Sequence, residues 1–288
     1  MNKLRDYIAD AERKGIAIGH FNISNLEALH GVCAAARELK LPIIIGVSEG
    51  EREFVGISEA AALVHAYREK YNQPVFLNAD HTYTVEGVKK AIDAGFDAVI
   101  FDGVKLSPEE NIISTRECVR YARASGRDVL VEAELGNIGQ SSKLLDKIPE
   151  GVSTNEKFLT TPEQAKNFVK ETGVDLLAPA VGNIHGMVKG GNPKLDIERI
   201  SEIRKACGVP LVLHGGSGIA DEDFENAIKA GISTIHINTE IRVAFVEALK
   251  KSLKENKKEI APYKIMKPTV DAIKEVVFNR LKLFNFLD

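Results

Sequence analysis

Short apolar runs alternate with longer amphipathic stretches along the whole chain. The runs are rich in β-branched residues, which is typical of buried strands, and the stretches between them carry apolar residues three and four positions apart, which is typical of helices. Clear helical stretches span residues 25–40, 58–70, 85–95 and 221–231. The eight apolar runs span residues 16–22, 41–48, 75–81, 98–103, 129–136, 176–183, 211–217 and 234–240.

This alternation predicts a parallel sheet covered by helices. Eight strand–helix units in 288 residues favour an α/β fold of the (β/α)8 TIM-barrel type, as a single domain over residues 1–288, with a doubly wound open sheet as the alternative. Residues 1–15 predict an N-terminal helix before the first strand. Residues 241–255 and 268–286 predict the last barrel helix and a C-terminal helical extension.

One predicted connection is unusually long. Residues 136–161 are polar and contain several glycines, and a helix is expected to begin only near Pro162. Connections of this length without regular structure are often lids or binding loops. This one leaves the carboxyl end of the fifth strand, which is the catalytic face of such a barrel.

Composition and charge exclude several classes of partner. The net charge of -3 gives no basic field for nucleic acid or an anionic membrane, so any anion site must be local. No apolar run has the length of a membrane span or the form of a signal peptide, and a cytoplasmic protein is expected. Cys33, Cys118 and Cys207 lack metal-site or disulfide spacing and are expected to be reduced core residues.

Three histidines stand at the ends of predicted strands. His81, His185 and His214 lie at or just beyond the ends of the third, sixth and seventh strands, so a barrel would bring them to one rim. Three imidazoles with an open fourth position are the form of a catalytic zinc site. His30 and His65 lie on helical stretches instead and are expected to be surface or core residues.

Carboxylates gather at the same rim. Asp80 precedes His81, and because neighbouring strand residues point to opposite faces, one of the two must lie past the regular strand for both to face the site. Glu132 and Glu134 share one face of the fifth strand, either in the barrel or solvated between the outer helices. Asp102 closes the fourth strand, where a turn or helix-capping role is the simpler interpretation.

The seventh strand ends in a loop that is almost free of side chains. Backbone N–H groups of Gly215, Gly216 and Ser217 could hold an anion, and Asn238 and Thr239 after the eighth strand could add donors. The loops after strands seven and eight are the usual phosphate site of this barrel, although a plain tight turn would also use glycine.

The predicted strands contain no lysine. An imine-forming aldolase needs a desolvated lysine amine in the barrel, so a metal ion is the favoured electrophile.

Taken in order, these motifs resemble the class II, metal-dependent fructose-bisphosphate/tagatose-bisphosphate aldolase family. The resemblance covers nearly the whole chain, and several motifs in order are far more specific than any one alone. They are FN at 21–22, SEG at 48–50, ADHT at 79–82, FDG at 101–103 with PEEN at 108–111, VEAELG at 131–136, AVGNIHG at 180–186, HGGSG at 214–218 and NTE at 238–240.

The resemblance implies a role for each matching residue. His81, His185 and His214 would bind one catalytic divalent metal, usually Zn²⁺. Asp80 would be the acid that protonates the aldehyde-derived oxygen, and Glu134 a carboxylate near the metal. Substrate and phosphate contacts are expected at Asn22, Ser48, Gly186, Lys189, Gly215, Gly216, Ser217, Asn238 and Thr239.

The chain departs from the family pattern at three places. Ser141 and Ser142 stand where the mobile loop commonly has an acidic pair, and Asp146 or Glu150 could substitute. His236 takes the place of a common asparagine and would either bind a substrate oxygen or be a further metal ligand, with Thr234 in place of a lysine. The common DGS is DGV at 102–104.

The leading hypothesis is a zinc-dependent aldolase that cleaves fructose 1,6-bisphosphate to dihydroxyacetone phosphate and glyceraldehyde 3-phosphate, as in glycolysis. Tagatose 1,6-bisphosphate is the alternative substrate. A noncatalytic sugar-phosphate-binding subunit of the same fold would explain the altered loop, whereas an unrelated metal-dependent hydrolase would not explain the order of the motifs. The family also implies a homo-oligomer, dimer or tetramer, and commonly a monovalent cation near the phosphate.

Overall fold

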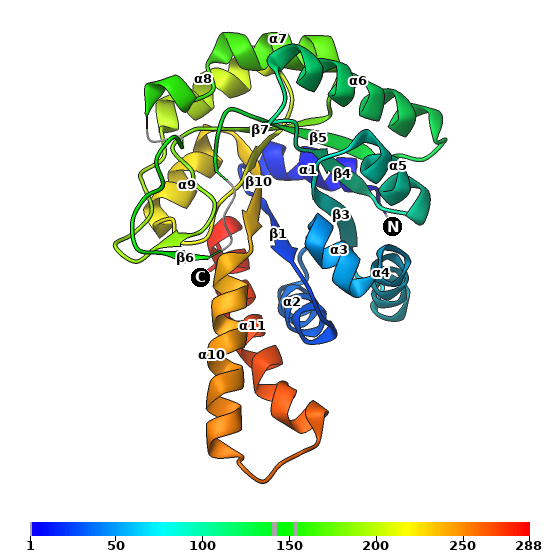
Figure 1. The fold of residues 1–288 in the computed structure, drawn as a ribbon, viewed down its shortest axis with the longest axis vertical. Helices are drawn as coiled ribbons and strands as arrows, with labels where there is room; N and C mark the ends of the chain where they lie inside the picture. The colour runs from blue at the N-terminus through cyan, green and yellow to red at the C-terminus, as the bar shows by residue number, and fades with distance from the viewer. Residues whose placement is uncertain (1, 140–142, 153–154) are drawn as a thin grey trace.

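A closed barrel of eight parallel strands forms the centre of the computed structural model, which describes residues 2–139, 143–152 and 155–288 (Figure 1). The strands neighbour one another in the order β1-β10-β9-β7-β5-β4-β3-β2, so the first and last strands close the barrel. The TIM-barrel prediction is confirmed. The barrel strands are β1 (Ile18–Asn22), β2 (Ile43–Val47), β3 (Val75–Thr82), β4 (Ala98–Phe101), β5 (Leu130–Leu135), β7 (Leu176–Pro179), β9 (Leu211–Leu213) and β10 (Ile232–Ile237).

Helices surround the barrel and bury its outer face. Their amphipathic faces pack on the strands through alanine, valine, isoleucine and leucine, which form one large core with the strands. The helices are α1 (Leu4–Lys14), α2 (Leu26–Leu39), α3 (Glu49–Val55), α4 (Ile57–Tyr71), α5 (Val85–Ala94), α6 (Pro108–Ala124), α7 (Pro162–Thr172), α8 (Ile197–Cys207), α9 (Asp221–Ala230), α10 (Thr239–Glu255) and α11 (Pro262–Phe284).

The two ends of the chain add elements to the basic barrel. Leu4, Ile8 and Ala11 of α1 pack on a second apolar cluster made by the first residues of the strands, so α1 closes the end of the barrel where the strands begin. The long helix α11 packs against α2 and α10. Together α10 and α11 extend from the barrel as an arm (Figure 1). No helix among the described residues is both long and apolar enough to cross a membrane.

Sequence signals set the helix ends near the site. Ser107 and Thr161 form capping boxes with Glu110 and Gln164, and each is followed by a proline at the first helical position, where a missing N–H costs nothing. These caps fix where α6 and α7 start. The residues that precede each helix therefore belong to the loops at the rim of the barrel.

A bulge in β3 turns two adjacent side chains into the barrel mouth. The pairing of β3 with β4 shifts register between Ala79 and Thr82, and His81 adopts a left-handed φ of 38°. The expectation that Asp80 or His81 lies past the regular strand is therefore wrong, because both belong to β3 and the bulge reorients them.

The long connection after β5 folds back over the rim. Its Leu144–Leu145 (β6) pairs in parallel with Met187–Val188 (β8), and a single 3₁₀ turn spans Glu156–Phe158. The rest of its described residues lack regular structure, as the sequence predicts. Ser141 and Ser142 lie outside the described residues.

Candidate active site

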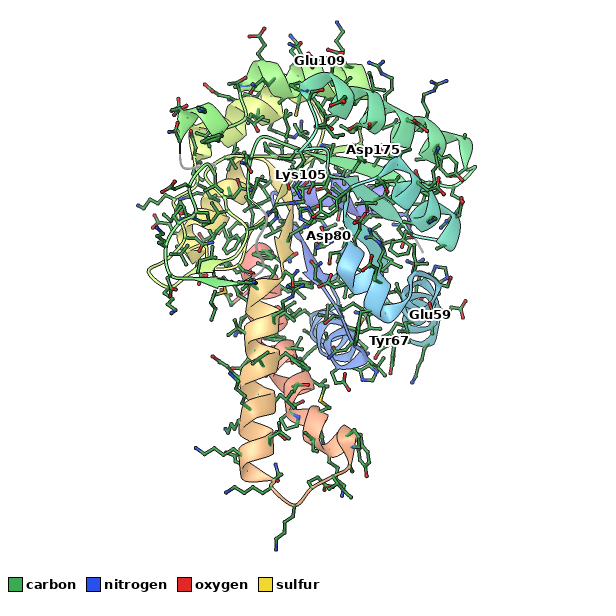
Figure 2. All side chains as sticks on the ribbon, viewed as in Figure 1. Glu59, Tyr67, Asp80, Lys105, Glu109 and Asp175 are labelled. Atoms are coloured by element: carbon green, nitrogen blue, oxygen red, sulfur yellow. The ribbon has the colours of Figure 1, made fainter. Side chains whose placement is uncertain are left out.

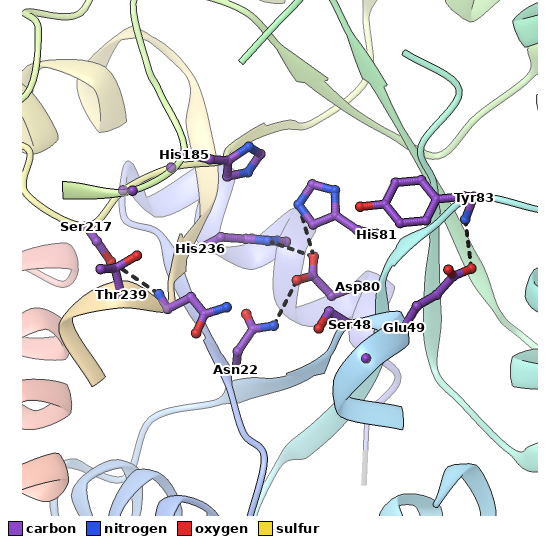
Figure 3. Close-up of a pocket in the computed structure, with 15 residues that line it drawn as sticks. Asn22, Ser48, Glu49, Asp80, His81, Tyr83, His185, Ser217, His236 and Thr239 are labelled. Atoms are coloured by element: carbon purple, nitrogen blue, oxygen red, sulfur yellow. Dashed lines mark hydrogen bonds and ion pairs between the residues drawn. The ribbon is translucent and has the colours of Figure 1, made fainter. Parts of the chain in front are cut away.

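A cavity opens at the carboxyl ends of the barrel strands. Figure 3 shows Asp80 and His81 between Ser217 and Thr239 on one side and Tyr83 and Glu49 on the other. Twelve of the sequence-predicted site residues line it together with Glu49, Gly50 and Tyr83: they are Asn22, Ser48, Asp80, His81, His185, Gly186, Gly215, Gly216, Ser217, His236, Asn238 and Thr239.

The barrel places the polar residues of the site at the inner, carboxyl ends of the strands and solvated side chains on the outer helices. Figure 2 shows Asp80 within the ring of strands, whereas Glu59 and Tyr67 belong to the outer helix α4. Asp80 is 3% exposed although it is a carboxylic acid, so its neighbours must satisfy it.

His81, His185 and His214 meet at the floor of the cavity, where His81 and His185 line it and the fully buried His214 lies behind them. Their ring centroids lie 4.8 to 5.6 Å apart, and one ring nitrogen of each, with a carboxylate oxygen of Glu134, falls within a group whose atoms are all within 4.8 Å of one another. Three nitrogens and one carboxylate oxygen are a donor set that suits Zn²⁺.

Each imidazole is oriented through its other nitrogen. His81 Nδ1 is 2.9 Å from Asp102 Oδ2, and His185 Nδ1 is 2.6 Å from the carbonyl oxygen of Gly139. The ring of His214 places Nε2 2.8 Å from an oxygen of Glu132. Such partners fix the ring orientation and the tautomer of metal-binding histidines.

Two buried atoms test whether these residues fit a cation. His214 Nδ1 and Glu134 Oε2 lie 3.1 Å apart, but neither makes a hydrogen bond of normal geometry. A buried ring nitrogen facing a buried carboxylate oxygen is costly without a shared partner, and a divalent cation supplies one. The residues therefore fit the expected metal ion.

Charge around the histidines favours cation binding. Burial lowers the pKa of His81, but the charge of Asp80 and the bond to Asp102 outweigh it and raise that pKa to about 9. The two glutamates likewise outweigh burial and raise the pKa of His214 well above its usual value. Burial and the neighbouring His81 lower the pKa of His185 to about 4.

Asp80 is held between three polar neighbours. Its Oδ2 accepts a hydrogen bond of 2.8 Å from Asn22 Nδ2. Its Oδ1 lies 3.5 Å from His236 Nδ1 and 3.9 Å from His81 Nε2, without a hydrogen bond. Burial alone would raise the pKa of Asp80, but His81 and His236 hold it well below the usual range, so the group is a carboxylate.

Three imidazoles stack from the barrel interior to the candidate metal site. His20 and His236 are 3.5 Å apart at 4° between planes, and His236 and His214 are 4.2 Å apart at 24°. His20 and His236, with Asp80, offer ligand atoms within 4.8 Å of one another, but the two rings are nearly parallel, so their in-plane lone pairs point side by side and not at one ion. This geometry favours hydrogen bonding to substrate for His236.

Glycine at position 46 makes room for the stack. A Cβ there would lie 2.1 Å from Cε1 of His20, and His20 itself is fully buried. The pKa of His20 is lowered to about 4, mainly by burial, so its ring is neutral.

The loop after β9 forms a cradle of backbone. Gly215 has a φ of 62°, and a Cβ on it would come within 2.2 Å of the carbonyl oxygen of Ile184. Ser217 Oγ accepts from the backbone N–H groups of Asn238 and Glu240, both at 3.2 Å, and so ties this loop to the start of α10. The N–H of Gly216 donates to the carbonyl oxygen of His236 at 3.1 Å, so of the three predicted loop donors Gly215 and Ser217 remain for an anion. Asn238 does not cap α10 with its side chain, and the positive dipole end of that helix suits an anion.

Lys189 lies apart from the other predicted site residues. Its side chain is 67% exposed, its ammonium contacts Asp146 Oδ1 at 2.6 Å, and it does not line the cavity.

Sequence reasoning missed several residues that shape the site. Asp102 and Glu132 orient histidines. The role of Asp102 was missed because an acid at the end of a strand is equally typical of a turn. His20 reads as one polar residue in an apolar run. Glu49 and Tyr83 carried a usable signal, because Glu49 follows directly on the predicted strand 41–48 and Tyr83 lies two residues after the predicted strand 75–81.

Comparison with known proteins identifies the class as an aldolase, a carbon–carbon lyase. The family model described as "Fructose-bisphosphate aldolase class-II" matches residues 2–288, and the chain belongs to that family. The resemblance read from the motifs is confirmed. Members of this family are generally metal-dependent and bind sugar phosphates, in agreement with the histidine cluster and the cradle.

Named relatives span the whole chain. A fructose-bisphosphate aldolase of Geobacillus stearothermophilus is 40% identical over 98% of this chain and 96% of its own. A probable fructose-bisphosphate aldolase of Bacillus subtilis is 38% identical over the same shares. Among solved structures, the YdjI aldolase of Escherichia coli K12 is 34% identical with a TM-score of 0.82, over 98% of this chain and 96% of that one.

Proposed function

We propose that this chain catalyses the reversible, zinc-dependent aldol cleavage of a phosphorylated ketose to dihydroxyacetone phosphate and an aldehyde. The observation that carries the proposal is the cluster of His81, His185 and His214 beside a cavity that also holds an anion cradle. Fructose 1,6-bisphosphate is the first substrate to test. Tagatose 1,6-bisphosphate is the alternative, since none of the described residues that line the cavity favours one configuration over the other.

The metal would be held by His81, His185, His214 and Glu134. When bound, it supplies Lewis-acid stabilisation of the negative charge that develops on the ketose oxygens. The loop Gly215–Ser217 and the start of α10 hold the phosphate, which fixes the three-carbon unit beside the histidines. A monovalent cation near that phosphate remains a prediction from the family.

Asp80 is the proposed proton-transfer group. In cleavage its carboxylate accepts the proton of the hydroxyl group on the carbon that becomes the aldehyde, and the bonding electrons of the broken carbon–carbon bond pass to the ketose carbonyl and leave an enediolate. The enediolate then takes up a proton at carbon and leaves as dihydroxyacetone phosphate. In condensation the proton returns to the new hydroxyl. Asn22 holds the carboxylate at 2.8 Å, and His236 beside it offers a further contact for a substrate oxygen.

Assembly into a homo-oligomer, dimer or tetramer, is also proposed. The arm of α10 and α11 presents Leu253, Ile260 and Tyr263 with 51%, 88% and 74% of their surface exposed. Apolar side chains that gather on a protruding element are typical of contact surfaces. Sedimentation of the purified chain decides the state. A cytoplasmic location, without a nucleic-acid or membrane partner, stays a prediction.

Metal removal tests the proposed function directly. We expect chelation to abolish cleavage of the ketose bisphosphates, addition of Zn²⁺ to restore it, and His81→Ala to lower kcat/KM by roughly 10³-fold, because several kcal/mol of charge stabilisation are lost. His65→Ala, on the exposed face of α4, is the matched control. Failure to bind zinc, together with no turnover of either sugar, would favour the noncatalytic binding subunit.

A further inference from the structure

The two ends of the active-site cavity differ in charge. One end is the cradle of Gly215–Ser217 with the start of α10. The opposite end is made by Ser48, Glu49 and Gly50 at the start of α3 and by Tyr83 after β3, with Asp80 and His81 between the two (Figure 3). We call Ser48–Gly50 with Tyr83 the distal wall.

The aldehyde half of the substrate must face the distal wall. If the cradle holds the phosphate of the dihydroxyacetone unit and the histidines hold its oxygens, the bond that breaks lies on the far side of the histidines from the cradle. Everything beyond that bond extends toward Ser48, Glu49 and Tyr83. A bisphosphate would place its second phosphate there.

The described lining of the cavity holds no lysine or arginine, and the residues outside the described ranges are not basic either. The charged side chain of the distal wall is Glu49, whose Oε1 accepts a hydrogen bond of 3.1 Å from the backbone N–H of Tyr83. No ion pair to Glu49 is found in the part of the chain that the structure describes. A phosphate dianion beside this carboxylate would be repelled.

Two arginines near the distal wall are committed to other partners, and the nearby lysine lies outside the cavity lining. Arg52 is buried and donates to the carbonyl oxygens of Val47 and Asp80 and to Thr82 Oγ1. Arg242 pairs with Glu51 at 2.7 Å. Lys105 is exposed, with its ammonium 5.5 Å from the ring centre of Tyr83, and lies outside the cavity lining.

We propose that the distal wall selects an aldehyde that carries hydroxyl groups and no phosphate, so that the favoured substrates are ketose 1-phosphates and not 1,6-bisphosphates. The Ser48 hydroxyl, which donates to Glu51 Oε2 at 2.9 Å, and the Glu49 carboxylate accept from sugar hydroxyl groups, and the Tyr83 hydroxyl donates to them and accepts from them. The proposal rests on the aldolase activity proposed above and narrows its substrate class.

The test compares matched substrates with the zinc-loaded full chain. kcat/KM is measured for fructose 1-phosphate against fructose 1,6-bisphosphate, and for the corresponding tagatose pair, by coupled assay of dihydroxyacetone phosphate. We expect the 1-phosphate to be favoured roughly tenfold or more in at least one pair. A ratio of one or below in both pairs overturns the proposal.

Two charge-neutralising variants locate the cause. Glu49→Gln keeps an oxygen for the Tyr83 N–H, and we expect it to raise kcat/KM for the bisphosphate and so to lower the preference at least about threefold. Glu53→Gln makes the same charge change on the exposed side of α3 and should leave the preference unchanged. Equal effects of the two variants, or a selective loss of bisphosphate cleavage in Lys105→Ala, overturn the proposal.

A separate measurement tests the proposed aldolase function independently of the substrate selection. Exchange of a C3 proton of dihydroxyacetone phosphate with D₂O, followed by NMR, needs the cradle and the histidines but no aldehyde. Absence of exchange in the zinc-loaded enzyme refutes the aldolase function itself. Exchange without cleavage of any of the four ketoses leaves that function standing and overturns the selection of ketose 1-phosphates.

Discussion

Asp102 contacts the Nδ1 side of His81 and so determines which nitrogen of that ring faces the cavity. The carboxylate is 4% exposed, and it also accepts from the backbone N–H of Val104 at 3.3 Å. The turn role expected from sequence is therefore real but incomplete. The same side chain holds the turn and orients a candidate metal ligand.

Replacing Asp102 by Asn removes the charge that favours an N–H on Nδ1 of His81. We expect Asp102→Asn to lower zinc affinity by roughly 10- to 100-fold, because an incorrectly oriented ligand must be rearranged on binding. Competition against a chromophoric chelator measures this. Asp93→Asn, on the exposed side of α5, is the control, and equal affinities of both variants would contradict the positioning role.

Single residues also mark the limit of sequence reasoning at the site. His81, His185 and His214 could be predicted because each lies at or just beyond the end of a predicted strand, and strand ends meet in a barrel. His20 could not, because its role depends on a ring stacked from the neighbouring strand and on the missing side chain at position 46. Contacts between side chains of different strands leave no pattern in the local sequence.

Among the elements, the connection after β5 is tied to the barrel by a small sheet. β6 and β8 pair through only two residues each, too short for any periodicity, which is why the sequence predicts a plain loop there. Beside this sheet, Asp146 and Lys189 form an ion pair with side chains 85% and 67% exposed. Ion pairs this exposed contribute little to stability.

The structure therefore places Asp146 in solvent rather than in the cavity. We expect Asp146→Ala and Glu150→Ala to retain kcat within about twofold and to change the free energy of unfolding by less than about 0.5 kcal/mol. Steady-state kinetics and chemical denaturation measure both. A tenfold drop in kcat for Asp146→Ala, but not for Lys189→Ala, would instead show that this carboxylate reaches the substrate.

Regular elements of ordinary length were accessible from the pattern of hydrophobic positions. The bulge in β3 was not, because it changes the register without changing the apolar alternation. The helix α3 was not expected either, since its seven residues hold too few turns to show a period. Both irregularities lie at the cavity, where Asp80, His81 and Glu49 depend on them.

At the scale of the whole molecule, the reactivity of the three cysteine thiols measures how often the helices separate from the barrel. Cys33 in α2 and Cys118 in α6 are free, fully buried, and have pKa values raised to about 12 by burial. Cys207 is free and half-buried. Because the thiolate is the reactive form, a raised pKa and burial both protect the first two.

Alkylation should therefore separate the three cysteines. With iodoacetamide at pH 8, we expect Cys207 to react first, and Cys33 and Cys118 only when the barrel opens, so that their rates follow the free energy of unfolding. Mass spectrometry of peptides over time measures each rate. Modification of Cys33 as fast as Cys207 under native conditions would show that α2 separates from the barrel without global unfolding.

Gly46 and His20 constrain how this chain can change over generations. A side chain at 46 would overlap the imidazole of His20, so any substitution there is blocked while that ring is present. Loss of the imidazole opens position 46, and a residue that then settles there prevents the imidazole from returning. The order of the two substitutions is thus fixed, and a lineage that takes both has lost the deepest ring of the stack irreversibly by single steps.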